Sequence, residues 1–414
     1  MTSTRNRPLV RNPQALSFRV CRWCVCWLLI SWSVTALAAD PFEIPPAPEQ
    51  GGEAWLVTFG PGQIYWERFG HNAIWLREPA LGLDHTFNFG FFDFEQEDFF
   101  LRFMRGRMLY FSVAQPADRE FDFYRQQNRS IRVQKLNLSS VQYNSLRDHL
   151  LYEVRPENRD YRYDYYLNNC STRIRDAIDI ALDGALAERT RQMPASLNFR
   201  EQTRRLTQMQ FWYYLGLELG LGFPVDREVS RWDEMFVPGV VADELADFSV
   251  AVGEFGKPLL AVDTMLFTTT MPAPAEAPSQ VWHRYLAFGL ILTVLAWLSG
   301  KFMPPVWLAG LSQAWILNAV TIGLLLSALW LFTDHEVTRP NANLLLFNPL
   351  LALALLPALR RFGAVVLAGG VVCAAVLLVF PVRQYNLDVL ALVAPVNLVV
   401  AAYLWRNSYR REGA

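Results

Sequence analysis

The final third of the chain holds five apolar stretches, which restrict the fold more than any other feature of the sequence. They are Val281–Leu298, Ala314–Phe332, Leu344–Leu359, Ala364–Phe380 and Leu387–Trp405. Each is about as long as a helix that crosses the roughly 30 Å hydrocarbon core of a bilayer. The stretches therefore predict an all-α domain of five transmembrane helices over residues 281–414.

The charges between these stretches predict their orientation. Lys301, the pair Arg360–Arg361 and Arg406 all fall on one side of the predicted bundle. The acidic loop Asp334–Glu336 falls on the other side. Because basic residues collect on the cytoplasmic side of a membrane, we expect a multi-pass protein of the bacterial inner membrane with a cytoplasmic C-terminus.

The N-terminal residues predict export across that membrane. Several arginines precede the apolar run Trp23–Leu37, and the small residues Ala36–Ala38 offer a cleavage site, as in a secretory signal peptide. We expect residues 1–39 to be the signal peptide and residues 40–270 to form one soluble periplasmic domain. Three prolines in residues 271–280 indicate a linker to the first membrane helix.

The soluble domain reads as strands in its first half and helices in its second half, which is typical of the α+β class. Alternating or buried apolar runs predict strands over 54–59, 72–76, 85–89 and 130–136. Helical spacing and capping residues predict helices over 94–104 and 140–153, and a further helix that starts near Cys170.

Cys170 is the one cysteine expected outside both the signal peptide and the membrane stretches. An unpaired thiol in an oxidising compartment is exposed to oxidation, so its presence there calls for a reason. Asn168 and Asn169 can cap the helix that follows, and the dipole at a helix start favours thiolate. We therefore predict that Cys170 is a nucleophile; the alternative is a packed, structural cysteine.

A cysteine nucleophile needs a base that a third polar group orients. His71 begins a predicted strand and is our candidate for the base. If the turn between the second and third strands centres near residues 80 and 81, Asn88 becomes the diagonal neighbour of His71 on the same face of the sheet. A slip of one residue would reverse this choice, so His85 and Asp93 remain alternatives for the third member.

Two further segments could contact lipid. The aromatic run Phe211–Gly216 could receive acyl chains near the bilayer, or it could be an ordinary packed helix. The loop between the second and third membrane stretches carries His335, Thr338, Asn341 and Asn343 on the same side as Cys170. Polar residues at a membrane boundary can line a site or can simply anchor the loop.

Six motifs follow one another along the chain. They are Gly70–Ala73, Phe87–Phe94, Pro156–Arg159, Tyr163–Arg173, Trp232–Pro238 and Asp334–Leu345. In this order they resemble the Lnb-like family of bacterial membrane proteins, described as lipoprotein N-acyltransferases with a thiol-dependent periplasmic domain. The resemblance implies a permuted papain-like fold, similar to the NlpC/P60 and LRAT-type enzymes, with His71 as base and Cys170 as nucleophile.

The resemblance implies a thiol acyltransferase whose cysteine takes an acyl group from a phospholipid and passes it to an amine, such as a lipoprotein N-terminus. The alternatives are a periplasmic thiol hydrolase, either a lipase or a peptidoglycan amidase or peptidase, and a non-enzymatic envelope assembly or lipid-binding protein. No phosphate-binding loop, dinucleotide fingerprint or His-Glu-x-x-His motif occurs, so we expect no cofactor and no metal. A net charge of −1 argues against nucleic acid as a partner.

Overall fold

The computed structural model describes residues 44–250, 257–380 and 383–409. The predicted signal peptide over residues 1–39 lies outside the described residues. Two hydrophobic cores are present in the described part. One lies in the soluble domain, and the other lies among the apolar C-terminal helices.

The soluble domain is built on a seven-stranded antiparallel sheet with strand order β6-β4-β3-β2-β1-β5-β9. Its strands are β1 (Glu53–Phe59), β2 (His71–Glu78), β3 (Leu83–Phe91), β4 (Leu109–Pro116), β5 (Ile131–Leu136), β6 (Asp160–Arg162) and β9 (Leu260–Phe267). A second, two-stranded sheet pairs β7 (Ser249–Val250) with β8 (Lys257–Pro258). The expected α+β character is confirmed, with the strands arranged in an antiparallel sheet.

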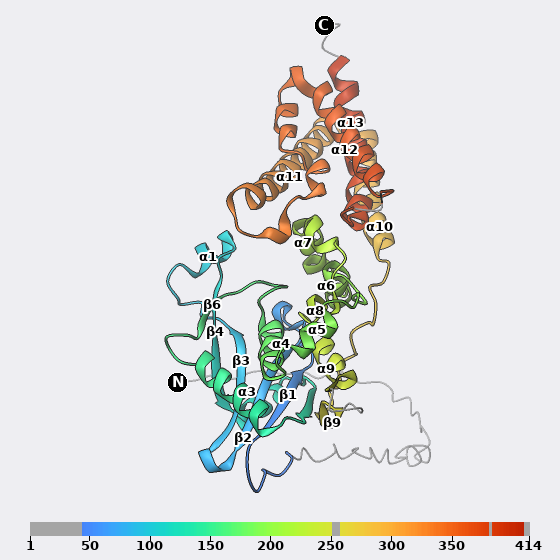
Figure 1. The fold of residues 1–414 in the computed structure, drawn as a ribbon. Coiled ribbons are helices and arrows are strands. Elements are labelled where there is room, and N and C mark those ends of the chain that lie inside the picture. The colour runs from blue at the N-terminus through green and yellow to red at the C-terminus, as the bar shows by residue number, and fades with distance from the viewer. Residues whose placement is uncertain (1–43, 251–256, 381–382, 410–414) are drawn as a thin grey trace, which may run out of the picture. The chain divides into compact units, whose positions relative to one another are not determined.

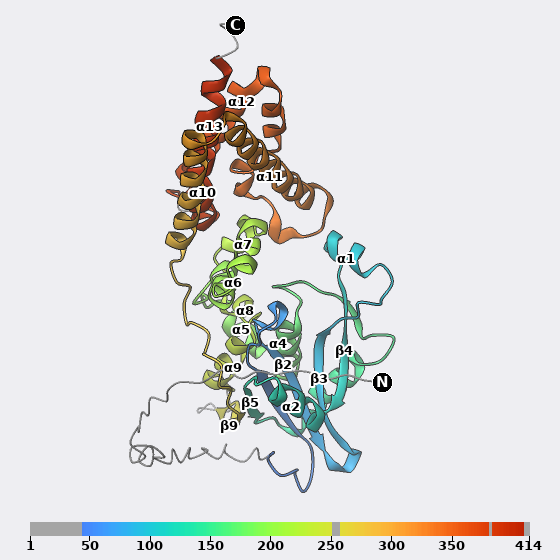
Figure 2. The same cartoon turned by 180° about the vertical axis from the view of Figure 1, so that it is seen from behind.

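Helices cover both faces of this sheet. On one face α4 packs against β2 and β3, and α3 packs on α4 (Figure 1). On the opposite face α2 packs against β3, β4 and β5 (Figure 2). The helices of the soluble domain are α1 (Phe99–Arg105), α2 (Ala117–Gln126), α3 (Ser140–Glu153), α4 (Cys170–Ala181), α5 (Ala185–Thr190), α6 (Phe199–Thr207), α7 (Phe211–Gly220), α8 (Arg231–Glu234) and α9 (Pro238–Asp247).

The four strands that the sequence predicted are present, and α3 has the predicted bounds, with Ser139 as its N-cap. The helix predicted over 94–104 is wrong at its start, because α1 begins at Phe99 after Asp98 adopts a left-handed conformation with φ 57°. The strands β4, β6 and β9 and the helix α2 were not predicted. Strand β9 lies at an edge of the sheet, where exposed side chains blur the alternation that marks a half-buried strand.

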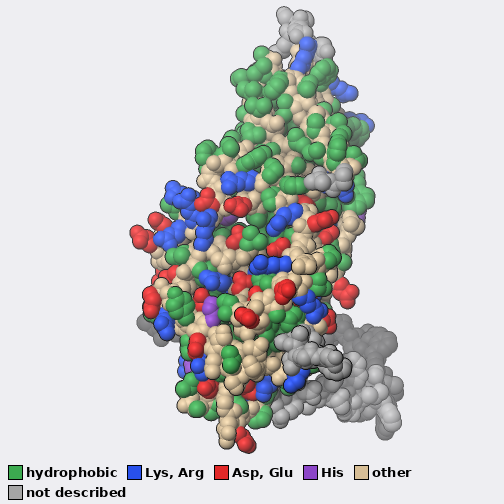
Figure 3. All heavy atoms as spheres, viewed as in Figure 1, with side chains coloured by type: hydrophobic (Ala, Val, Ile, Leu, Met, Phe, Trp, Pro, Cys, Tyr) green, Lys and Arg blue, Asp and Glu red, His purple; other side chains and the backbone are tan. Residues whose placement is uncertain are grey.

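The C-terminal region differs from the predicted five-helix bundle. Four helices in the described residues are long and apolar enough to cross a membrane. They are α10 (Trp282–Phe302), α11 (Pro305–Phe332), α12 (Arg360–Leu377), which a short turn at Pro357 extends, and α13 (Leu387–Tyr409). Figure 3 shows hydrophobic side chains over these helices, whereas charged side chains of both signs spread over the soluble domain.

The expected third membrane helix is absent from its predicted place. Residues 342–359 instead form the short 3₁₀ turns η5 (Ala342–Leu345), η6 (Pro349–Leu355) and η7 (Pro357–Leu359). Prolines at 349 and 357 start two of these turns, and proline cannot donate the hydrogen bond that a continuous α-helix needs. Residues 344–359 are apolar, as the sequence analysis noted. Their length and hydropathy alone do not show that the helix is broken into short turns.

The segment over residues 342–359 still runs along the length of the bundle. At its start the backbone N–H of Ala342 donates to Gln384, which precedes α13, with a distance of 2.7 Å. Just after its end the side chain of Arg361 donates to Ser408 near the C-terminus of α13, at 3.1 Å. The segment of short turns therefore extends from the N-terminal end of α13 to its C-terminal end.

Candidate active site

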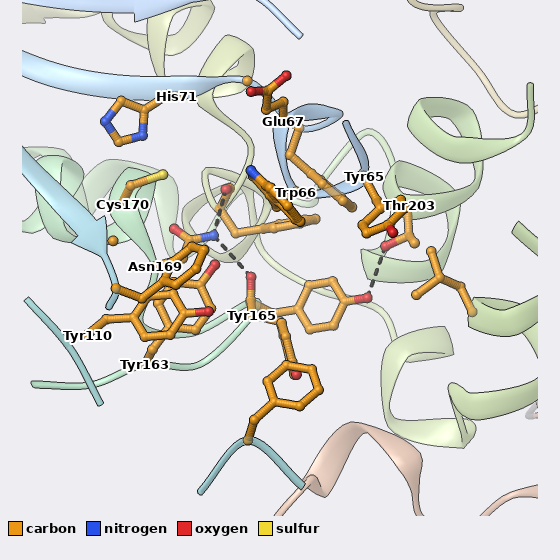
Figure 4. Close-up of a pocket in the computed structure, with 18 of the residues that line it drawn as sticks. Tyr65, Trp66, Glu67, His71, Tyr110, Tyr163, Tyr165, Asn169, Cys170 and Thr203 are labelled. Atoms are coloured by element: carbon orange, nitrogen blue, oxygen red, sulfur yellow. Dashed lines mark hydrogen bonds between the residues drawn. The ribbon is translucent and has the colours of Figure 1, made fainter. Parts of the chain in front are cut away.

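Cys170 is the first residue of α4, and its position is fixed by the residue before it. Asn169 is the N-cap: its side-chain oxygen accepts from the backbone N–H of Thr172 at 2.9 Å. The side-chain amide of Asn169 donates to the carbonyls of Tyr165 and Phe236, both at 3.0 Å (Figure 4). The predicted Asn cap is confirmed, and it also ties the start of α4 to two neighbouring segments.

A glycine on the adjacent strand lets the cysteine approach the sheet. Gly90 has φ +93°, in the left-handed region, where β3 departs from its register with β4. A Cβ placed on Gly90 would lie 3.4 Å from the Cβ of Cys170. Glycine supplies both the backbone conformation and the space at this point.

A buried hydrogen-bond chain holds α4 against the sheet beside the cysteine. The hydroxyl of Ser171 donates to the side-chain oxygen of Asn72 at 2.8 Å, and the amide of Asn72 donates to Thr58 at 2.8 Å. Ser171 is in α4, Asn72 in β2 and Thr58 in β1. The chain fixes the first turn of α4 relative to the strand that carries His71.

The pairing of β2 with β3 is the one that the sequence predicted. Ala73 lies opposite Asn88, so His71 and Asn88 are diagonal neighbours on one face. The Nε2 of His71 lies 2.9 Å from the Oδ1 of Asn88. The amide nitrogen of Asn88 donates to the buried carboxylate of Glu120 on α2, at 3.0 Å.

This arrangement determines which nitrogen of His71 carries hydrogen. Because the amide nitrogen of Asn88 faces the Glu120 carboxylate, its oxygen faces His71 and must accept. Nε2 of His71 is then the donor, and Nδ1 keeps its lone pair. In Figure 4 the sulfur of Cys170 lies beside the imidazole of His71. The imidazole is thus held in the tautomer that can take a proton from the thiol.

Aromatic rings and one arginine surround the imidazole. Phe59 and Tyr124 both stack with His71, with ring centroids 6.1 Å and 6.4 Å away. The guanidinium of Arg129 lies over the ring of Tyr124, 4.5 Å from its centroid, and pairs with Glu67 at 3.7 Å. These residues confine the imidazole, and Arg129 places a positive charge near the thiol.

Burial favours the neutral forms of both Cys170 and His71. It raises the pKa of the Cys170 thiol to about 11, although the backbone amides of Asn72, Ser171 and Cys170 and the charge of Arg129 act in the opposite direction. Burial lowers the pKa of His71 to about 4, whereas the hydrogen bond that His71 donates to Asn88 raises it. The pKa of Cys170 is thus shifted away from the thiolate that the helix start favours, because desolvation outweighs the helix amides.

Cys170 and His71 lie at one end of a cavity of about 790 Å³. Seventeen of the 34 residues that line it are Phe, Tyr or Trp. Glu67 and Arg129 are the charged side chains among the described lining residues, apart from the two histidines. A volume in the range of roughly 300–1,000 Å³ with apolar walls is typical of a site for a small or lipid-like ligand.

The cavity walls come from distant parts of the chain. Phe99, Phe100 and Phe103 of α1 line it, as does Leu329 of α11. His335 and Thr338, which the sequence singled out in the outer loop, also line the cavity. Of the other loop candidates, Asn341 and Asn343 do not line it; their side chains bind backbone carbonyls at the end of α7.

The two reserve candidates for the third member lie elsewhere. His85 pairs with Leu76 on the opposite face of β3 from Asn88, and neither it nor Asp93 is among the lining residues. Asp93 is an exposed turn residue whose carboxylate accepts from the backbone of Glu95 at 2.8 Å. In the described part of the chain, no group of three or more His, Cys, Asp or Glu side chains is arranged to hold a metal ion.

Comparison with known families decides what the soluble domain is. Residues 53–217 match the family described as the Lnb N-terminal periplasmic domain. This segment is an Lnb periplasmic domain. It holds β1 to β6, α1 to α6 and most of α7, and thus all of Cys170, His71, Asn88 and Glu120. Searches of curated proteins and of solved structures found no match to the chain.

The segment that matches the Lnb domain precedes four helices that are long and apolar enough to span a membrane. The sequence missed Glu120, Tyr124 and Arg129, which complete the surroundings of His71. A signal was available for the first two. Ala117, Glu120, Phe121 and Tyr124 follow the i, i+3, i+4, i+7 spacing of the buried face of α2.

Proposed function

We propose that this protein is a membrane-anchored thiol acyltransferase, in which Cys170 is the nucleophile, His71 the base and Asn88 the residue that orients it. The observation that supports the proposal most is the lining of the aromatic cavity, which includes both Cys170 and Leu329, a residue of the candidate membrane helix α11. Such a cavity suits an acyl chain better than a polar peptide or glycan. The order of histidine before cysteine agrees with a permuted papain-like arrangement.

The first half of the reaction forms an acyl-enzyme. Nδ1 of His71 takes the thiol proton as the sulfur attacks the ester carbonyl of a phospholipid, because the two groups are neutral at rest. The backbone N–H groups of Cys170, Ser171 and Asn72 face the sulfur and can stabilise the oxyanion. The ester C–O bond then breaks, and the imidazolium gives its proton to the leaving alkoxide.

The second half transfers the acyl group. An amine, such as the N-terminal amine of a lipoprotein, attacks the thioester carbonyl, and the C–S bond breaks. His71 takes the amine proton and returns it to the sulfur, so the products are an amide, a lysophospholipid and the resting thiol. Water in place of the amine would make the same residues a hydrolase.

The protein would act in the bacterial inner membrane, with the Lnb domain in the periplasm and the C-terminus in the cytoplasm. The test is an assay on full-length protein with a phospholipid radiolabelled in its acyl chains and a diacylglyceryl peptide as acceptor. We expect label in an N-acylated peptide with wild type and none with Cys170→Ala. Release of labelled fatty acid without amide would assign hydrolysis instead. Absence of both products, and of an acyl thioester on Cys170 by mass spectrometry, would refute the proposal.

A further inference from the structure

One stripe of α7 forms a wall of the cavity. Tyr213, Gly216, Leu217 and Gly220 all line it, and their spacing of i, i+3, i+4 and i+7 places them on one face of the helix. The opposite face, with Tyr214 and Glu218, is buried against the membrane region and α6. The helix α7 therefore separates the cavity from the protein interior.

The two glycines leave this wall open. A Cβ built on Gly216 or on Gly220 meets no atom within 4 Å. Glycine within a helix costs about 1 kcal/mol relative to alanine, and this helix has ten residues. Neither glycine has a positive φ or a close neighbour that would require it. The feature that both share is the empty space beside them, in the cavity.

The other end of the cavity lies at the boundary of the membrane helices. The helix α11 ends at Phe332, and the backbone N–H of Asp334 donates to the carbonyl of Arg105 on α1 at 2.7 Å. His335 bonds the carbonyl of Phe103 at 2.9 Å. Leu329, one turn before the end of α11, lines the cavity. The helix α1 is thus attached where a candidate membrane span ends.

Large apolar side chains are exposed around this boundary. Phe100 and Met104 of α1 are 67% and 60% exposed, and Phe332 of α11 is 79% exposed. On the other side of the opening, Trp212 of α7 is 71% exposed and its ring lies 6.4 Å from Phe288, within α10. Aromatic residues gather at the interfaces of membrane proteins. The outer leaflet of the bilayer is therefore the surrounding that suits these exposed apolar side chains.

We propose that the cavity opens sideways into the outer leaflet between α1, α7 and the end of α11, and that one acyl chain of a membrane lipid enters past Gly216 and Gly220. These glycines then determine how long a chain can be accommodated. The inference rests on the proposed function for the ester that reacts, but the entrance of the chain does not require turnover.

The test separates chain binding from chemistry. Full-length Cys170→Ala in nanodiscs is exposed to a phospholipid that carries a diazirine near the end of one acyl chain, and cross-linked peptides are identified by mass spectrometry. We expect cross-links to cavity residues of α1, α7 and α11. Adding Gly216→Leu should reduce these cross-links about tenfold, because the leucine side chain would fill the space beside Gly216 in the cavity. Leucine has a higher helix propensity than glycine, so the substitution should not disrupt α7. Gly310→Leu is the matched control, since Gly310 is in α11, has no atom within 4 Å of its Cβ position and lies off the cavity.

A second readout detects damage to the site itself. Acylation of Cys170 by p-nitrophenyl acetate should fall much less in Gly216→Leu than cross-linking does, because an acetyl group is too short to reach this wall of the cavity, and Gly310→Leu should leave it unchanged. Cross-linking to the cavity that persists in Gly216→Leu, or cross-links confined to the outer surfaces of α10 and α12, would overturn the proposed entrance. Loss of cavity cross-links in Gly216→Leu, together with no transfer by wild type, would support the entrance while refuting the acyltransferase.

Discussion

Two clusters of buried polar side chains lie in this molecule, and they are built in different ways. Beside the cavity, His71, Asn88 and Glu120 are joined by two hydrogen bonds, and the imidazole at the end of this chain lies beside the sulfur of Cys170. Between α6 and α7, Arg200 pairs with Asp226 at 2.8 Å and with Glu218 at 3.3 Å. Both clusters are buried, but only the first contributes a side chain to the cavity wall.

The second cluster continues into the membrane region. Arg204 donates to the hydroxyl of Tyr214 at 2.8 Å, and Tyr214 donates to Asp388 of α13 at 2.5 Å. Burial raises the pKa of Glu218 to about 7, and the nearby Arg200 and Arg204 oppose this rise. A perturbed pKa and deep burial therefore occur in both clusters. The cluster around His71 differs in that it reaches the cavity and fixes the tautomer of the imidazole, as a candidate catalytic site would. The cluster around Arg200 is a network of ion pairs that connects structural elements, and we call it the ionic joint.

The largest effect should come from removing the nucleophile. Cys170→Ala should lower acyl transfer at least about 1,000-fold, because no other group can form the thioester. The rate of labelled amide formation measures this loss. Cys373→Ala is the control: Cys373 is exposed on α12 and should leave the rate unchanged. Equal loss in both variants would place the chemistry elsewhere.

The ionic joint should instead control stability. Arg200→Met leaves two buried carboxylates without their partner, and we expect a loss of about 3–5 kcal/mol in the free energy of unfolding. Thermal unfolding in detergent, compared with the exposed Arg119→Met (expected within about 0.5 kcal/mol), measures it. If Arg200→Met kept full stability but lost turnover per folded molecule, the contrast between the two clusters would be wrong.

The third prediction concerns the orienting amide. Asn88→Ala removes the acceptor for Nε2–H of His71, so the imidazole can turn or change tautomer, and kcat should fall about 100-fold with little change in KM. Glu120→Gln should have a smaller effect, since its amide oxygen can still accept from Asn88. A fall in thermal stability that accounts for the whole loss of activity in Asn88→Ala would argue for a structural role alone.

The last prediction concerns the dependence of the reaction of Cys170 on pH. Because the pKa of Cys170 is about 11, the fraction of thiolate rises about tenfold for each pH unit below that value. The rate of alkylation of Cys170 by iodoacetamide should rise in the same way from pH 7 to pH 10. Because the pKa of His71 is near 4, the base stays neutral, and acylation of Cys170 by the donor should show no loss on acidification from pH 7 to pH 5.5. A plateau of alkylation between pH 5 and pH 8 would instead reveal a preformed ion pair.

The sequence predicted the parts of the site that depend on local rules. The turn at Pro79–Leu81 sets the register of β2 and β3, and that register alone brings Asn88 to His71. Glu120 was not predicted, because a hydrophobicity pattern assigns a carboxylate to the solvent-exposed face of a helix, whereas Glu120 lies on the buried face of α2. Its burial makes sense only once Asn88, which it binds, is in place.

In the membrane region the sequence predicted less than it did at the site. Hydropathy located every apolar stretch, but it cannot separate a span-length helix from the 3₁₀ turns over residues 342–359, because both expose the same kinds of side chain. The neutral state of the thiol was also beyond local reasoning. It depends on burial of the thiol against segments that are distant in sequence, such as β3 at Gly90.

The last turn of α7 has a practical consequence. Its carbonyls at Glu218, Leu219 and Gly220 receive the side-chain amides of Asn341 and Asn343, which follow the second membrane helix. Helix ends that lose such donors fray in water. A fragment that ends at residue 270 would therefore keep Cys170 and His71 but lose the donors that hold the end of α7. The C-terminal third of the chain thus supports one wall of the cavity as well as supplying the candidate membrane spans.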